Sequence, residues 1–144
     1  MAHHPDHSAP FIGAWTLLSY ELRLASGVVE KPMGERPLGR ILYTNNGQMA
    51  AQVAAGGLDP LANADPLDAT VEEAACAWLN YVGYWGTYTV DAAAGIVIHH
   101  VEGAWFPNWI GSDQERHYQF SGDRLTLEAH SSTWHARLVW QRVE

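Results

Sequence analysis

The chain has few cationic residues and a single cysteine. Eight Lys and Arg stand against sixteen Asp and Glu, so the formal net charge is −8. Nucleic acids and anionic membrane surfaces bind clustered positive charge, and the scattered cations here make neither partner expected. The lone Cys76 excludes an intramolecular disulfide, and its apolar surroundings predict a small buried side chain.

Long apolar runs are missing as well. No stretch approaches the roughly 18 residues of a membrane-spanning helix. Residues 1–10 are polar and rich in His, without the apolar core of a secretory signal, so they predict a flexible tail and a cytoplasmic protein. If Met1 is removed, the new terminus Ala2-His3-His4 has the atoms to chelate Cu(II) or Ni(II) in a square plane.

Several motifs of known chemistry are also missing. A Gly-rich phosphate loop and a Gly-x-Ser-x-Gly elbow do not occur, which argues against nucleotide cofactors and serine-hydrolase chemistry. His117 and His135 are isolated along the chain, and no Cys or His group has the spacing of a structural zinc site. We therefore expect no cofactor and no metal ligand.

Aromatic residues, in contrast, are plentiful. Seven Trp, six Tyr and three Phe occur among 144 residues. Because aromatic side chains bury large areas, they predict a thick core or an aromatic-lined cavity. The length suits one domain, which we expect to span residues 11–144.

Short β-prone runs alternate with turn residues along the chain. Asn45-Asn46-Gly47 marks a hairpin, and Thr70 with Glu73 forms a capping box that begins a helix over 71–82, expected to cover or pack against the strands. The sequential hairpins predict an all-β, antiparallel up-and-down barrel of about eight or nine strands with one short helix. The expected strands are 14–24, 28–30, 39–44, 48–53, 84–91, 96–102, 115–120, 124–129 and 133–143.

Gly13-Ala14-Trp15 resembles the Gly-x-Trp signature of lipocalins and their calycin relatives. In those proteins the Trp closes one end of the barrel and packs on an Arg from the last strand, a role that Arg137 or Arg142 would fill. From Gly13 onward the chain resembles the bacterial and fungal lipocalin-like domain family. The resemblance implies a barrel with an internal pocket and supplies no catalytic residues; its matching segments are 13–20, 41–49, 84–91, 99–103, 106–111 and 113–116.

Strand periodicity suggests which side chains meet inside this barrel. Pairing Val90 with Ile96 across the turn 92–95 places one set of side chains on a common face, which we expect to line the interior. Gly86 would leave an open spot beside His100. The set is Tyr84, Gly86, Tyr88, Ile98, His100 and Glu102.

This face predicts a candidate acid–base site. His100 and Glu102 could move a proton, and Arg116 on the next strand could stabilise an anion. Two alternatives stay open: the pair could be satisfied by neighbours or water at the barrel mouth, and Arg116 could pair with Glu102 or face solvent. The residues expected to contact a ligand are Tyr43, Tyr84, Gly86, Tyr88, Ile98, Asn108, Trp109 and Gln114.

Three functions fit these features. The first is a binding protein that carries a small hydrophobic or aromatic metabolite. The second is a cofactor-free isomerase, cyclase or dehydratase acting on an aromatic or polyketide-like molecule of secondary metabolism. The third is a barrel filled by its own side chains that acts through its surface. A homodimer is compatible with each of them.

Overall fold

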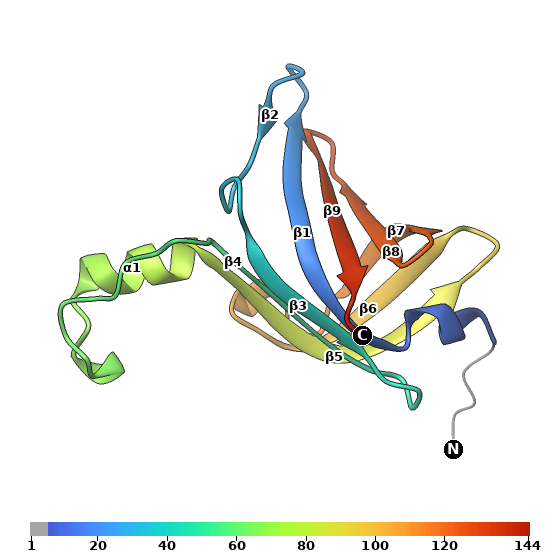
Figure 1. Ribbon diagram of the computed structural model, residues 1–144, viewed down its shortest axis with the longest axis horizontal. Helices are drawn as coiled ribbons and strands as arrows, with labels where there is room; N and C mark the ends of the chain where they lie inside the picture. The colour runs from blue at the N-terminus through green and yellow to red at the C-terminus, as the bar shows by residue number, and fades with distance from the viewer. Residues whose placement is uncertain (1–5) are drawn as a thin grey trace.

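The computed structural model describes residues 6–144 and shows an antiparallel β-barrel (Figure 1). From β3 to β8, each strand pairs with the strand that follows it in the sequence. β1 pairs with β3 and also with β9. This last pairing closes the sheet and removes its exposed edges. The predicted up-and-down barrel is confirmed. Its strands are β1 (Gly13–Leu24), β3 (Leu38–Tyr43), β4 (Gln48–Ala54), β5 (Tyr81–Asp91), β6 (Ile96–Ala104), β7 (Asp113–Ser121), β8 (Arg124–His130) and β9 (Trp134–Arg142), with the short β2 (Val29–Glu30) added beside β1.

The barrel has two unlike ends. At one end, which we call the closed end, the N-terminal 3-10 helix η1 (Asp6–Phe11) lies beside the start of β1 and the end of β9 (Figure 1). Residues 6–10 were expected to belong to a flexible tail, but here they lead into Phe11, which is 0% exposed. Residues 1–5 of that expected tail lie outside the described residues. At the opposite end, the open end, β1, β4, β6 and β8 finish.

An Arg from the last strand secures the closed end. The Arg142 guanidinium lies 4.2 Å from the centre of the Trp15 ring, which is 0% exposed. The same group donates hydrogen bonds to the carbonyls of Ile12 and Pro10 at 2.9 and 2.6 Å. Gly13 has a φ of +129°, and a Cβ there would lie 3.1 Å from Arg142. The chain thus has the Trp–Arg contact that the Gly-x-Trp resemblance implied, with Arg142 as the partner.

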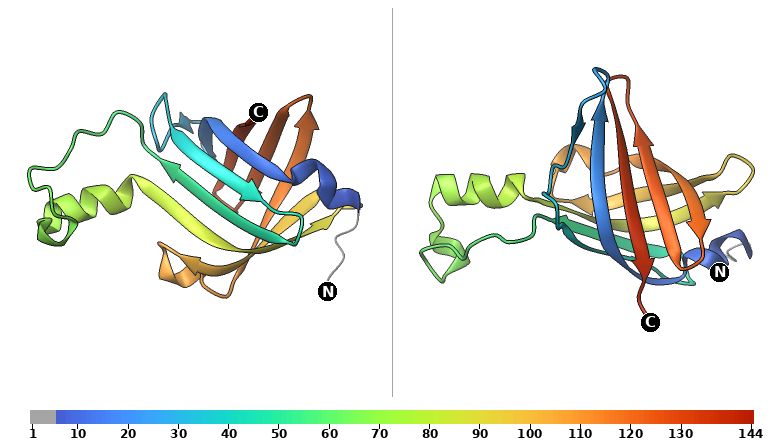
Figure 2. Two further views of the ribbon diagram at one scale, coloured as in Figure 1. Left: turned by 60° about the horizontal axis from the view of Figure 1, so that its bottom comes forward. Right: turned by 45° about the horizontal axis from the view of Figure 1, so that its top comes forward.

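The one α-helix among the described residues, α1 (Val71–Leu79), begins with the predicted capping box between Thr70 and Glu73. It ends three residues earlier than expected, because β5 already begins at Tyr81. The helix extends away from the barrel instead of covering it (Figures 1 and 2). None of its residues is buried, and Cys76 is exposed, which corrects the expectation of a buried thiol.

Two short 3-10 helices complete the chain: η2 (Pro66–Asp68) precedes α1, and η3 (Pro107–Trp109) lies between β6 and β7. The ring of Trp78 on α1 lies 5.8 Å from that of Trp105 at the open end. None of the helices within residues 6–144 is long and apolar enough to cross a membrane.

The closed end yields a prediction about stability. Replacing Arg142 by Ala removes the cation–π contact and two charge-assisted hydrogen bonds, so we expect the free energy of unfolding to fall by about 2–4 kcal/mol. Urea denaturation measures this loss. Arg137→Ala is the matched control, because Arg137 is an exposed residue of the same strand, and it should change the value by less than about 0.5 kcal/mol. Equal losses in the two variants would contradict the assigned role of Arg142.

Candidate functional site

The inside of the barrel contains a cavity of about 540 Å³ toward the open end, which we call the inner cavity. Its volume falls in the range of small-molecule sites. Aromatic and aliphatic side chains form most of its wall, and a few polar groups reach into it. The wall residues that carry the argument below are Tyr20, Tyr84, Trp105, Trp109, Gln114, Arg116, Ala136 and Trp140.

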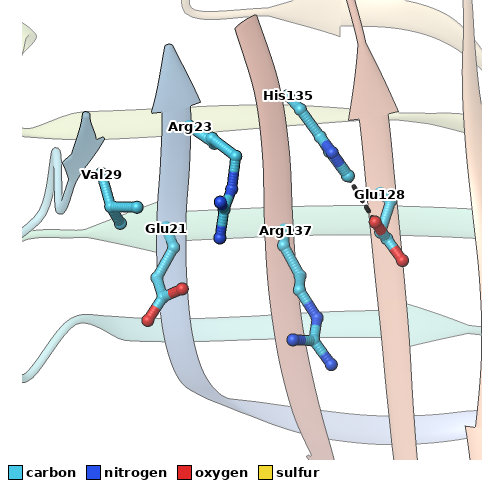
Figure 3. Close-up of a pocket in the computed structure, with 6 residues that line it drawn as sticks. All are labelled: Glu21, Arg23, Val29, Glu128, His135 and Arg137. Atoms are coloured by element: carbon cyan, nitrogen blue, oxygen red, sulfur yellow. Dashed lines mark hydrogen bonds and ion pairs between the residues drawn. The ribbon is translucent and has the colours of Figure 1, made fainter. Parts of the chain in front are cut away.

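A second hollow of about 350 Å³ lies on the outside of the barrel, over β1, β8 and β9 (Figure 3). Its wall is mainly charged: Glu21, Arg23, Val29, Glu128, His135 and Arg137. Apolar ligands gain most of their binding free energy by leaving water for an apolar wall. The inner cavity is therefore the better candidate site for a small aromatic molecule, although the outer hollow is of comparable size.

A buried hydrogen-bonded triad lies between the inner cavity and the closed end. His99 is 0% exposed, and its Nε2 is 2.7 Å from the Tyr43 hydroxyl. Its Nδ1 is 2.7 Å from the hydroxyl of Tyr84, which lines the cavity. A neutral imidazole donates through one nitrogen and accepts through the other. One tyrosine therefore accepts from His99 while its own hydroxyl proton remains available for another acceptor.

Burial keeps this triad uncharged. It lowers the pKa of His99 well below the usual value, and the nearby Arg116 and His100 lower it further. Burial also raises the pKa of Tyr43 well above its usual value and raises that of Tyr84, an effect that Arg116 opposes. The site consequently has neutral hydrogen-bonding groups near neutral pH, next to a single guanidinium.

Arg116 is the cation of the inner cavity. It comes from β7, is half-buried, and lies 5.9 Å from the centre of the Trp109 ring. Its guanidinium donates to the carbonyl of Glu115 at 3.0 Å and to the Gln114 side chain at 3.5 Å. Within residues 6–144, the ion pairs involve other groups, so no carboxylate neutralises Arg116. This side chain can therefore bind a carbonyl, phenolate or carboxylate oxygen.

Two tryptophans add unused donors to the same wall. The indole N–H groups of Trp105 and Trp140 are buried and lack a hydrogen-bond partner among the described residues. Both side chains line the inner cavity. Both nitrogens are shielded from solvent, so a molecule in the cavity would contact the indole rings and not these N–H groups.

The structure corrects the predicted register of β5 and β6. Asp91 pairs with Ile96, and Tyr88 pairs with His99, one residue away from the expected alignment. Because side chains alternate along a strand, this slip turns the whole face of β6 over. His100 points outward, where it contacts Thr89 at 2.9 Å and Asp113 at 2.8 Å.

Glu102 is exposed as well, beside a bulge between Trp85 and Gly86. The acid–base pair expected inside the barrel thus lies outside it, and the predicted enzyme loses the geometry on which it rested. Gly86 does not leave an open spot either, since a Cβ there would lie 1.9 Å from the His100 carbonyl oxygen. The glycine instead allows the two backbones to approach at the bulge.

The other predicted ligand contacts divide into three groups. Tyr84, Trp109, Gln114 and Arg116 come together on the cavity wall. Tyr43 and Tyr88 point inward but belong to the packed core near the closed end. Ile98 lies on the outward face of β6, and Asn108 is exposed in η3.

Sequence reasoning missed His99, the residue that links two tyrosines at the base of the cavity. The signal was present in β6 itself. One face of that strand carries Val97, His99 and Val101, and the other carries the carboxylate of Glu102. Turning a carboxylate inward costs more than burying an imidazole that finds partners, so the valine face is the one expected to be buried.

Comparison with known proteins identifies the family of this chain. The model of the family described as "Lipocalin-like domain" matches residues 12–143. The "4'-hydroxy-3'-methoxypropiophenone carrier protein ppsC" of Aspergillus oryzae is 40% identical over 85 residues, which are 55% of this chain and 77% of that protein. Among solved structures, a mutant of the fluorescent protein UnaG superposes with a TM-score of 0.43 at 8% identity, covering 92% of this chain and 96% of that one. A likeness at that level carries no information on function.

The buried imidazole predicts a specific pH dependence. The unfolded chain protonates His99 near pH 6.5, whereas the folded chain resists protonation until much lower pH. Below about pH 6.5 the unfolded state therefore binds more protons, and the free energy of unfolding falls with decreasing pH by up to about 1.4 kcal/mol per unit. Urea denaturation between pH 5 and 8 measures this slope.

His99→Gln serves as the comparison variant for this slope. Gln keeps a hydrogen-bonding side chain but cannot titrate. The free energy of unfolding of this variant should therefore fall less steeply with decreasing pH than that of the wild type, by up to about 1.4 kcal/mol per unit. His100→Gln, on the outer face, should keep the wild-type contribution of His99. Identical slopes in wild type and His99→Gln would show that His99 does not resist protonation.

Proposed function

We propose that this chain, which belongs to the lipocalin-like domain family, binds and carries a small aromatic molecule bearing oxygen acceptors in its inner cavity. The observation that carries the proposal is an aromatic-walled cavity of about 540 Å³ that contains one guanidinium without a carboxylate partner among residues 6–144. An apolar wall favours burial of a ring, and the single cation selects for oxygen on that ring or its substituent.

The donors in the cavity suggest the kind of ligand. The Arg116 guanidinium donates, the Tyr84 hydroxyl can donate as well, and the wall provides few charged acceptors. A molecule with ketone, methoxy or phenol oxygens would satisfy these donors better than a hydrocarbon or an amine. The relative from Aspergillus oryzae is named for an aryl ketone with hydroxyl and methoxy groups. A phenolic aryl ketone of that class is therefore the ligand that we propose for this chain.

Tyr84 would add selectivity to this site. Tyr84 lines the cavity, its hydroxyl is held by His99, and its side chain also interacts with Arg116. When it accepts from His99, it can donate to a ligand oxygen; when it donates to His99, its oxygen can accept from a ligand phenol. A neutral triad can therefore adapt to either a carbonyl or a hydroxyl group, and it does so without placing a second charge in the apolar interior.

Carriage is favoured over catalysis by the arrangement of titratable groups. Glu115 and His130 border the cavity as exposed residues; the other titratable groups of its wall are a guanidinium, which stays protonated at any physiological pH, and tyrosines whose pKa values are raised by burial. General acid–base catalysis works best with a group that titrates near the working pH. His99 is fully buried beneath Tyr84, so a ligand would meet the tyrosine first.

A binding experiment tests the proposal directly. Titration of the protein with 4'-hydroxy-3'-methoxypropiophenone, followed by tryptophan fluorescence, should give saturable binding of one molecule per chain. Arg116→Met should weaken binding roughly tenfold or more, because a charge-assisted hydrogen bond is lost. Arg124→Met, which removes an exposed guanidinium from β8, is the control and should bind like the wild type.

Two further measurements complete this test. Ala136→Phe places a ring in the cavity and should abolish binding while circular dichroism still reports a folded barrel. The ligand released after denaturation should be chemically unchanged by mass spectrometry. If the wild type converts the ketone into another compound and Arg116→Met does not, the protein is an enzyme. No saturable binding of this ketone, and no adduct by native mass spectrometry after incubation with a metabolite extract, would overturn the proposal.

A further inference from the structure

Four titratable side chains gather on the outer face of the barrel near the open end. They come from three adjacent strands: His117 from β7, Glu128 and His130 from β8, and His135 from β9. We call them the histidine cluster. The strand register brings them together, since His130 pairs with His135 and His117 pairs with Glu128. Paired residues on one face of a sheet have neighbouring Cβ atoms, so the cluster is built into the barrel.

Three of these residues converge tightly. The potential ligand atoms of Glu128, His130 and His135 all lie within 4.8 Å of one another. The His130 and His135 rings are 4.1 Å apart between centres, and His135 Nε2 contacts a Glu128 carboxylate oxygen (Figure 3). The His117 ring lies 4.9 Å from that of His130. The contact with Glu128 accounts for the position of His135 alone. It does not account for the two further imidazoles, those of His117 and His130, beside it.

We propose that Glu128, His130 and His135 form a binding site for a divalent transition-metal cation of the zinc type. Zinc binds imidazole nitrogen and carboxylate oxygen at about 2.0–2.2 Å in a tetrahedron, so small side-chain rotations would bring the three ligands onto one ion. The fourth position would be taken by water or by His117. The spacing along the chain hid this site: two ligands lie two residues apart on β8, and the third comes from the facing strand.

The hairpin between β8 and β9 makes the site preorganised. Residues 131–133 join the two strands, and the Ser131 hydroxyl accepts hydrogen bonds from the amides of Thr133 and Trp134 at 3.2 Å. All three ligands therefore lie on one short, hydrogen-bonded unit. Such a unit loses little conformational freedom when it binds a metal, which favours affinity.

Neighbouring charges set the expected strength of the site. Arg23 and Arg137 border the adjoining outer hollow and oppose a cation, whereas Glu21 and the net charge of −8 favour one. The Arg137 guanidinium points away from the His135–Glu128 pair along the strand (Figure 3). Exposed charges are screened by salt, so the affinity should depend mainly on the ligands themselves.

The site also lies next to the inner cavity. His130, a member of the histidine cluster, also lines the inner cavity, and Trp134 on the facing strand lines it too. A bound cation would hold the β8–β9 hairpin at this rim. The inference does not depend on the proposed carrier function, because the metal ligands point to the outside of the barrel.

Zinc titration of the full-length, chelator-treated protein by calorimetry tests the inference. The wild type should bind one Zn²⁺ that both His130→Ala and His135→Ala weaken at least tenfold. Zinc should also raise the Tm of the wild type and not that of the variants. His100→Ala is the matched control, because it removes an outer-face imidazole of β6 that is held by Thr89 and Asp113. It should bind zinc like the wild type.

The chelating sequence at the N-terminus requires a second readout. Co²⁺ added in place of zinc should give the intense visible absorption of a four-coordinate ion, which the His3→Ala/His4→Ala double variant should retain and His135→Ala should lose. If either His variant of the cluster fails to fold by circular dichroism, Glu128→Gln takes its place, with the same weakening expected. Zinc affinity unchanged in these cluster variants, or no zinc binding by the wild type at millimolar concentration, would overturn the inference.

Discussion

The pairing of β1 with β9 is the constraint on which the rest of this structure depends. It converts a meander into a closed barrel, and closure gives every strand an inner and an outer face. The Trp15–Arg142 contact secures this seam at one end, where Arg142 also binds the carbonyls of the N-terminal segment. A packed aromatic core fills the closed end. The unfilled part of the interior is the inner cavity, which lies toward the open end.

Polar groups inside the barrel are distributed so that few charges are buried. Among the described residues, Arg116 is the half-buried guanidinium of the inner cavity, and the polar groups buried near it are neutral: the Tyr43–His99–Tyr84 triad and two indole N–H groups. Burying a neutral group that is hydrogen-bonded costs far less than burying an ion, so the barrel can keep directional donors at an apolar site. On the outer face, charged groups remain in contact with water. There the imidazoles of the histidine cluster lie beside the Glu128 carboxylate.

The strands were predictable wherever a local signal marked them. Turn residues such as Asn45-Asn46-Gly47 and the capping box at Thr70 act within a few residues, and the structure has both where expected. The inward face of β5 was also assigned correctly, because its alternation is complete within one strand. The face of β6 was not, because the register between two strands depends on the turn that joins them, and a slip of one residue exchanges the faces. The length and direction of α1 relative to the barrel were likewise decided by the start of β5.

The family resemblance implied a Trp–Arg contact but left Arg137 and Arg142 open as the partner. The sequence by itself determined the fold class and the order of the strands. These properties follow from periodicity and from short-range turn and capping chemistry. Only the tertiary structure decided that Arg142 is the partner of Trp15, that His99 and not His100 faces inward, and that His130 and His135 meet beside Glu128. Each of these depends on the register between strands and on the curvature of a closed sheet, which bring together side chains that no spacing along the chain relates.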